Sequence, residues 1–90
     1  MQDANTRAAV KLALDFPIAM GNGATYTELT IRRQKVKDDL EIAAFPTAAE
    51  KEVVLFTRLA GVDREVIEEM DKSDYGKFQD LVMGFSKSPA

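Results

Sequence analysis

The sequence predicts an α+β domain in which an N-terminal β-hairpin is followed by about four short helices packed on one face. Two observations predict this fold. Apolar and polar residues alternate from residue 10 to 16 and from 25 to 33, on either side of a glycine-containing turn. From residue 36 onward, apolar residues recur every three or four positions instead. Because strands repeat every two residues and helices every 3.6, the hairpin precedes the helices.

The first predicted strand has one apolar side, formed by Val10, Leu12, Leu14 and Phe16. We expect that side to be buried. Pro17 follows, and proline has no amide proton to donate to a sheet. The strand is therefore expected to lie at an edge or to end near this residue. Gly21, Asn22 and Gly23 then tolerate the positive φ angles that a tight turn requires.

The second predicted strand covers residues 25 to 33 and is rich in threonine, tyrosine and isoleucine, which favour strands. Leu29 and Ile31 lie on one side of it, and Tyr26 lies on the other. A hairpin alone is barely stable, so the side with Leu29 and Ile31 must pack against the helices.

A first short helix is predicted before Pro46 by the apolar stripe of Val36, Leu40, Ala43 and Ala44. A second helix is expected from Thr47, which forms a capping box with Glu50, to about Ala60. Its apolar side carries Ala48, Leu55, Phe56, Leu59 and Ala60, whereas Lys51, Val54 and Arg58 point away from that side.

Gly61 is expected to end the second helix, and Asp63 to cap a short third helix that carries Val66, Ile67 and Met70. A final helix begins near Asp71 or Ser73. Its apolar face carries Tyr75, Phe78, Leu81, Val82 and Phe85, and Met83 projects elsewhere. The residues expected to be largely buried in the core are Leu29, Ile31, Phe56, Leu59, Phe78 and Phe85.

The length of 90 residues favours a single domain. We expect a loose N-terminal arm at residues 1–9, the domain at residues 10–86 and a polar tail at residues 87–90. No apolar run approaches the roughly 18 residues of a membrane span. The N-terminus also lacks the basic start and apolar core of a signal peptide. The expected location is therefore the cytoplasm, with no membrane partner.

The chain contains no cysteine and no histidine, which excludes disulfides, thiolate or imidazole metal sites, and the commonest nucleophiles and general bases. A carboxylate cluster is formed by Glu65, Glu68, Glu69 and Asp71. It lacks the ligand spacing of a calcium loop, so we interpret it as a solvated helix face. We expect no catalytic residues, no cofactor and no metal. A carboxylate enzyme is the least favoured function.

Nucleic-acid binding is disfavoured by the net charge of -3. A basic run consists of Arg32, Arg33, Lys35 and Lys37, but Asp38, Asp39 and Glu41 lie alongside and neutralise it. We interpret the run as a charged edge that discourages strand aggregation. Residues 47–70 also resemble a helix-turn-helix, although the second helix would present Glu65, Glu68 and Glu69 to phosphates. A small helix-turn-helix-like transcription regulator is the alternative function.

Three segments, in order, resemble the phage tail assembly chaperone family that includes tail protein E of P2-like phages and its Mu-like counterparts. Residues 25–32, TYTELTIR, are similar to its Tyr-x-Glu-Leu-x-Leu-Arg segment. Residues 59–67, LAGVDREVI, are similar to its Leu-x-Gly-Leu-x-x-Glu-Val-Leu segment. Residues 70–75, MDKSDY, followed by Leu81 and Phe85, are similar to its closing helix. Gln34, Lys37 and Asp63 depart from the family pattern, in connecting segments.

The resemblance implies a non-enzymatic assembly chaperone. Such proteins bind the tape measure protein, the long helical ruler of the tail, keep it soluble and assist tail tube assembly around it. The tape measure protein is thus the expected partner, with the tail tube protein and a second copy of the chain as further ones. The implied location is the host bacterial cytoplasm, outside the mature virion.

Three apolar residues are candidates for the partner-binding surface because each is expected to lie outside the core. They are Tyr26, on the outer hairpin face, Val54, opposite the apolar side of its helix, and Met83, off the stripe of the final helix. Taken singly, each is better explained as a scattered surface residue. If two or more adjoin, they form a binding or self-association surface, for which methionine is well suited.

Overall fold

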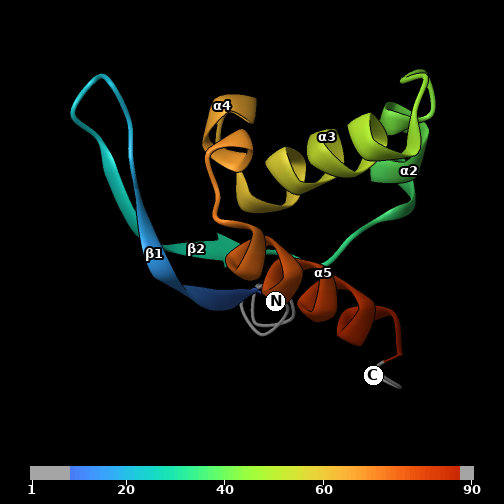
Figure 1. Ribbon diagram of the computed structural model, residues 1–90. Helices are drawn as coiled ribbons and strands as arrows, with labels where there is room; N and C mark the ends of the chain where they lie inside the picture. Colours follow the sequence, from blue (N-terminus) through green and yellow to red (C-terminus); the bar gives the residue numbers. More distant parts are fainter. Residues whose placement is uncertain (1–8, 88–90) are drawn as a thin grey trace, which may run out of the picture.

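The computed structural model describes residues 9–87. Along the chain it has β1 (Val10–Ala19), β2 (Thr25–Ile31), α2 (Val36–Ile42), α3 (Ala48–Ala60), α4 (Arg64–Glu68) and α5 (Lys72–Lys87) (Figure 1). The predicted α+β fold, a hairpin followed by helices, is confirmed. The predicted arm at residues 1–9 lies outside the described part except for residue 9. Of the predicted tail at 87–90, only Lys87 is described, and it belongs to α5.

The hairpin turn forms at the predicted glycine–asparagine–glycine segment. The Met20 amide donates to the Ala24 carbonyl at 2.8 Å, and Gly23 donates back to Met20 at 3.0 Å. Gly23 has a φ of 95°, which a residue without a Cβ adopts at little cost. The Asn22 side chain accepts from the Ala24 amide at 3.0 Å, which closes the turn.

The two strands pair antiparallel, but their register shifts between Ala13 and Ile18. Pro17 lies inside this irregular stretch, so its missing amide proton costs no ladder bond, and β1 continues to Ala19. Leu14 and Ile18 are buried, whereas Phe16 is 56% exposed. The prediction that Phe16 shares the buried side is therefore wrong, because the irregularity breaks the strict alternation of the strand.

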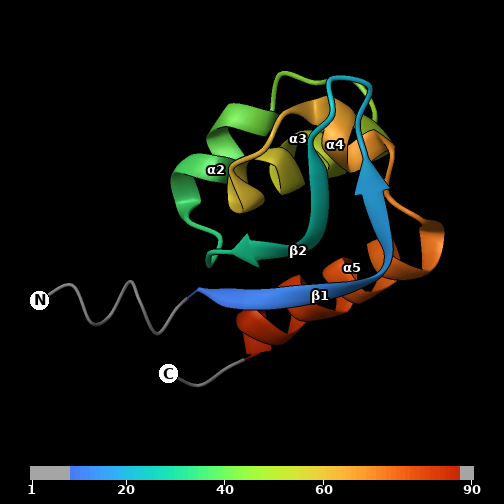
Figure 2. The same cartoon turned by 90° about the vertical axis from the view of Figure 1, so that its left-hand side faces the viewer.

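The helices lie on one side of the bent hairpin, as Figure 2 shows with the hairpin toward the viewer. Helix α3 contacts β2, and α5 contacts β1. The core between them consists of Leu14, Ile18, Leu29, Ile31, Leu55, Phe56, Leu59, Val66, Ile67, Phe78 and Val82. At its centre the rings of Phe56 and Phe78 stack with their centroids 3.9 Å apart. Of the predicted core residues, all are buried except Phe85, which is partly buried.

The helix ends follow the predicted signals with one exception. The Thr47 hydroxyl accepts from the Glu50 amide at 3.1 Å, and Gly61 ends α3 with a φ of 67°. Asp63 precedes α4 but makes no capping hydrogen bond with its side chain. The Asp71 carboxylate instead accepts from the amide and hydroxyl of Ser73 at the start of α5. Within residues 9–87, none of the helices is long and apolar enough to cross a membrane.

Candidate partner-binding surface

Helix α2 is turned in the opposite sense to the one its sequence suggests. Val36 is 75% exposed and Leu40 71% exposed, and Ala43 and Ala44 beyond them are exposed as well. The buried side of the helix instead holds Asp38, whose side chain is 0% exposed. The prediction that this apolar stripe packs on the hairpin is therefore wrong. The stripe faces outward, and a carboxylate faces the protein.

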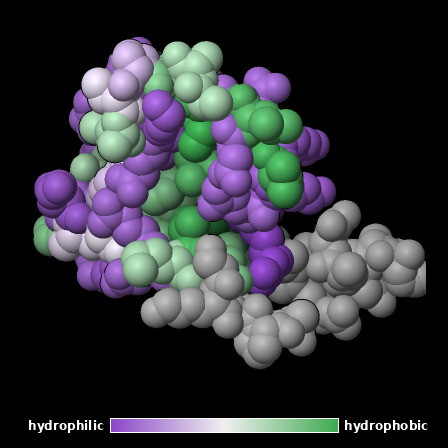
Figure 3. All heavy atoms as spheres, turned by 90° about the vertical axis from the view of Figure 1, so that its right-hand side faces the viewer, coloured by the Kyte–Doolittle hydropathy of each residue, from purple (hydrophilic) through white to green (hydrophobic). Residues whose placement is uncertain are grey.

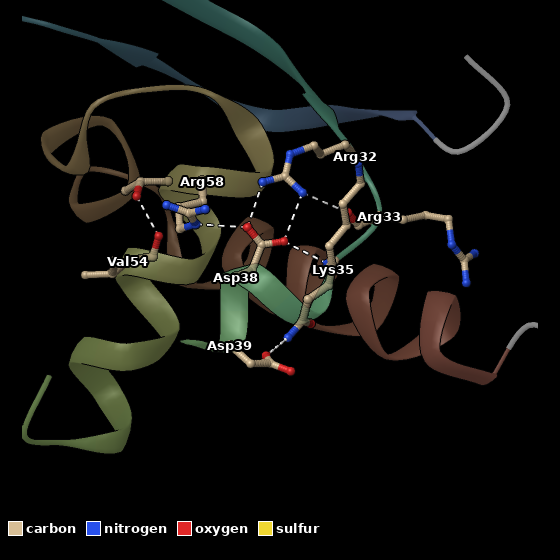
Figure 4. Close-up of polar contacts among 9 residues, drawn as sticks. Arg32, Arg33, Lys35, Asp38, Asp39, Val54 and Arg58 are labelled. Atoms are coloured by element: carbon tan, nitrogen blue, oxygen red, sulfur yellow. Dashed lines mark hydrogen bonds and ion pairs between the residues drawn. The ribbon is translucent and has the colours of Figure 1, made fainter. Parts of the chain in front are cut away.

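A network around Asp38 explains this orientation (Figure 4). The Arg32 guanidinium binds both carboxylate oxygens, with Nη1–Oδ2 at 2.9 Å and Nη2–Oδ1 at 2.7 Å. Arg58 Nε donates to Oδ1 at 2.9 Å, and the Lys35 backbone amide donates to Oδ2 at 2.7 Å. Two arginines, one in the segment between β2 and α2 and one on α3, thus satisfy one carboxylate, as a buried charge requires.

The network has a clear effect on ionisation. The hydrogen bond from Arg32 holds the pKa of Asp38 far below its usual range; burial opposes this effect, and the Lys35 amide and Arg58 reinforce it. Of the acidic residues expected to neutralise the basic run, Asp38 pairs with Arg32. Arg58, which was expected to point away from the apolar side of its helix, turns toward α2 and reaches Asp38 there.

The segment between β2 and α2 is also fastened to the rest of the fold. The Arg32 amide donates to the Leu59 carbonyl of α3 at 3.0 Å. Arg33 points the other way, toward α5, where its Nη2 donates to the Phe85 carbonyl at 2.9 Å. Its guanidinium lies 5.3 Å from the centre of the Phe85 ring, within cation–π range. These contacts hold the start of α2 in one position.

Figure 3 shows the side of the molecule that carries α2 and the C-terminal turns of α5. Hydrophobic side chains form a region down the middle of this face, bordered by hydrophilic side chains. Exposed apolar side chains of this kind are the usual mark of a protein-binding surface when they are contiguous. We define the outer stripe as Val36, Leu40, Ala43 and Ala44.

The structure does not bring the three sequence-predicted candidates together. Tyr26 is partly buried and packs against the core near the hairpin turn, and Val54 is partly buried on α3, one turn before Arg58. Met83 is 57% exposed on the C-terminal half of α5. In both ribbon views the hairpin turn and the end of α5 lie at opposite ends of the molecule. They therefore do not form one patch, although their individual roles are untested.

Sequence reasoning treated the outer stripe as the packed side of its helix, so it missed Val36 and Leu40 as surface candidates. A signal for the true orientation was present in Asp38, which lies about 160° around the helix from Leu40, two residues away at 100° per residue. A carboxylate opposite an apolar stripe, with arginines available nearby, permits either orientation. Only the tertiary position of Arg58 decides between them.

A second buried carboxylate, Asp74, holds the irregular part of β1. Its oxygens accept from the amides of Asp15 and Phe16, each at 3.0 Å, and Lys77 Nζ lies 3.5 Å away. Burial raises the pKa of Asp74, but the two amides and Lys77 outweigh it, so the net pKa is lowered. These are backbone amides that the neighbouring strand leaves without partners, and the role of Asp74 is therefore structural.

A third polar group lies between α3 and α5. The Oε1 of Glu52, on α3, accepts from the Tyr75 hydroxyl at 2.7 Å and from Gln79 Nε2 at 2.9 Å. Burial, together with Glu52, raises the pKa of Tyr75. This arrangement ties two helices together and leaves the tyrosine protonated at neutral pH, so it offers no general base.

The acidic residues of α4 line an open cleft of about 550 Å³ beside the hairpin turn, with Glu65, Glu68 and Glu69 on one side. Arg64 pairs with Glu68 at 2.8 Å and with Glu50 at 3.7 Å. Within residues 9–87, no three carboxylates are grouped closely enough to hold a metal ion. Helix α4 has only five residues and buries Val66 and Ile67, which leaves little length for reading a DNA groove.

Comparison with known protein families identifies a match over most of the chain. The model of the family described as phage tail assembly chaperone proteins, E, or 41 or 14, matches residues 11–87. Neither the curated proteins nor the solved structures include a significant match. The matched range covers both strands except Val10, as well as all the helices of the described part.

Proposed function

The chain belongs to the phage tail assembly chaperone family, and from this membership we propose that it binds the tape measure protein, keeps it soluble and assists tail tube assembly around it. This is a binding role without catalysis. The protein would act in the host bacterial cytoplasm and would be absent from the mature virion. The tail tube protein is a further partner consistent with this role.

The observation that carries the proposal is the exposure of Val36 and Leu40 on a helix whose opposite side is pinned by Asp38. A tape measure protein is a long helical chain with apolar stripes. These stripes are exposed to solvent until the tail tube encloses the chain. Exposed branched side chains on a firmly held helix can pack against such a stripe. This packing requires apolar residues in the tape measure protein but no particular sequence. The lack of cysteine and histidine in the chain agrees with a binding role.

Co-expression with the tape measure protein encoded by the same phage or prophage tests the proposal. We expect the soluble fraction of the tape measure protein to rise with the chaperone present, and the two to copurify on a tag carried by either. The Phe78→Ala variant serves as a control, because loss of a buried core ring removes the folded chaperone without removing its expression. Equal tape measure solubility with and without the folded chain would contradict the proposal.

A further inference from the structure

We propose that the outer stripe of α2 is the docking site for an amphipathic helix of the tape measure protein. This inference rests on the proposed function and specifies its surface and the kind of segment bound. The stripe has the spacing of such a site: Val36, Leu40, Ala43 and Ala44 stand at positions i, i+4, i+7 and i+8. Val36 and Leu40 lie on one side of α2, and Ala43 and Ala44 continue the exposed surface in the turn after its last residue, Ile42.

The stripe is presented rigidly. Asp38, on the opposite side of the same two turns, is held by Arg32, Arg58 and the Lys35 amide. Arg33 fastens the preceding segment to the end of α5. A binding surface that is already ordered loses little conformational entropy when its partner arrives, which favours useful affinity from a small area.

The rest of this sequence does not supply the occupant. The other large apolar side chains of the helices are mostly committed to the core or packed against it. Residues 1–8 and 88–90 contain Met1 as their one large apolar side chain. A single methionine cannot cover both Val36 and Leu40, so these terminal residues do not cover the stripe.

Size disfavours a second copy of this protein as the occupant. Helix α2 has seven residues and is thus roughly 10 Å long. Its outer face is far smaller than the roughly 800 Å² per partner of a stable dimer.

A helix of another protein can be longer than α2. It can carry lysine or arginine opposite Asp39 and a carboxylate opposite Lys37, the two charges that border the stripe on its opposite sides. It can also be long enough to contact the face beyond α2 that Figure 3 shows as apolar. The favoured ligand is therefore a helical segment with apolar residues at spacings of three and four, flanked by charges of both signs.

The test measures binding of full-length tape measure protein, and of overlapping 25-residue peptides from it, to the wild type and to the double variant Val36→Gln, Leu40→Gln. Glutamine keeps length and helix propensity while removing the apolar branches. We expect affinity to fall roughly tenfold for each side chain. Phe16→Gln is the matched control, since Phe16 is 56% exposed but lies on β1, outside the stripe. It should bind as the wild type does.

The outcomes separate the inference from the proposed function. If the wild type binds neither the tape measure protein nor its peptides, both fail. If the wild type binds and the double variant binds equally well, the docking site is wrong and the function stands. A photo-crosslinking amino acid at position 40 gives a second readout that does not depend on the double variant folding. Crosslinks to a tape measure helix support the inference, and crosslinks chiefly to a second copy of the chain overturn it.

Discussion

Arg58 on α3 donates from Nε to Oδ1 of Asp38 on α2 at 2.9 Å, across 20 residues of sequence. This one contact explains why α2 shows its apolar side to solvent. A buried carboxylate needs charged or hydrogen-bonding partners, and here Arg32, before α2, and Arg58, on α3, supply them. The helix is therefore fastened by its polar side, and its apolar side remains available.

Replacing Asp38 by asparagine should lower the free energy of unfolding by about 2 kcal/mol. The estimate lies below the roughly 3–5 kcal/mol of a fully buried pair, because both arginines are about one third exposed. Urea denaturation measures the change. Asp39→Asn is the matched control, since Asp39 neighbours Asp38 but is exposed, and its effect should stay within about 0.5 kcal/mol. Equal effects from the two variants would contradict the anchoring role of Asp38.

Stability should fall in acid. The pKa of Asp38 is lowered in the folded state by Arg32, so its contribution is complete above the unfolded-state pKa of about 3.9 and is lost as the pH falls below it. The slope in that range is about 1.4 kcal/mol per pH unit for each proton taken up. The pKa of Asp74 is lowered in the folded state as well, so protonation of Asp74 adds to the loss of stability in acid. In urea denaturation between pH 7 and pH 2.5, the free energy of unfolding should fall less steeply with decreasing pH for Asp38→Asn than for the wild type.

The sequence sufficed for the elements that local signals define. The hairpin turn, the Thr47 cap and the Gly61 end of α3 all depend on residues within a few positions of one another. The aromatic core was likewise predictable, because Phe56 and Phe78 each repeat at helical spacing with other apolar residues.

The orientation of α2 and the course of β1 depend on contacts that are distant in sequence. Periodicity identifies an apolar side of a helix but not the direction in which it faces, and for α2 that direction is set by Arg58. Alternation places Phe16 with Leu14, but Asp74 of α5 binds the amides of Asp15 and Phe16, where the ladder is interrupted. No local pattern links residues 15 and 74. The candidate surface could not be predicted for the same reason.

Asp74→Ala should destabilise the fold by about 2–3 kcal/mol, because it leaves the amides of Asp15 and Phe16 without their carboxylate acceptor. Asp74→Asn should cost less, since the amide oxygen can still accept one of the two bonds. Asp80→Ala, an exposed position on the same helix, controls for the gain in helix propensity. Chemical denaturation measures the free energy of unfolding of the three variants. If Asp74→Ala loses no more stability than Asp80→Ala, Asp74 does not stabilise the irregular part of β1.

Phe56→Ala should cost about 3–5 kcal/mol through lost burial and the cavity left beside Phe78. For a domain of this size, whose total stability is about 5 kcal/mol at the low end, that approaches complete unfolding. Phe16→Ala is the matched control: the same ring is removed from a position 56% exposed, and the melting temperature should change little. An unchanged melting temperature for Phe56→Ala would exclude that residue from the core.

The residues proposed from the sequence as a partner surface should separate into two groups when each is changed to serine. Tyr26→Ser and Val54→Ser should lower the melting temperature, because both side chains are partly buried, and Tyr26 packs against the core. Met83→Ser should leave it nearly unchanged, because Met83 is 57% exposed. Any loss of tape measure binding by the first two would then follow their loss of stability. A loss of tape measure binding by Met83→Ser would indicate a direct contact.

Thermal melts and tape measure solubility, measured on the same preparations, distinguish these cases. If all three variants keep their stability and all three lose binding, the surface predicted from the sequence is the functional one, and the outer stripe of α2 is not the main site.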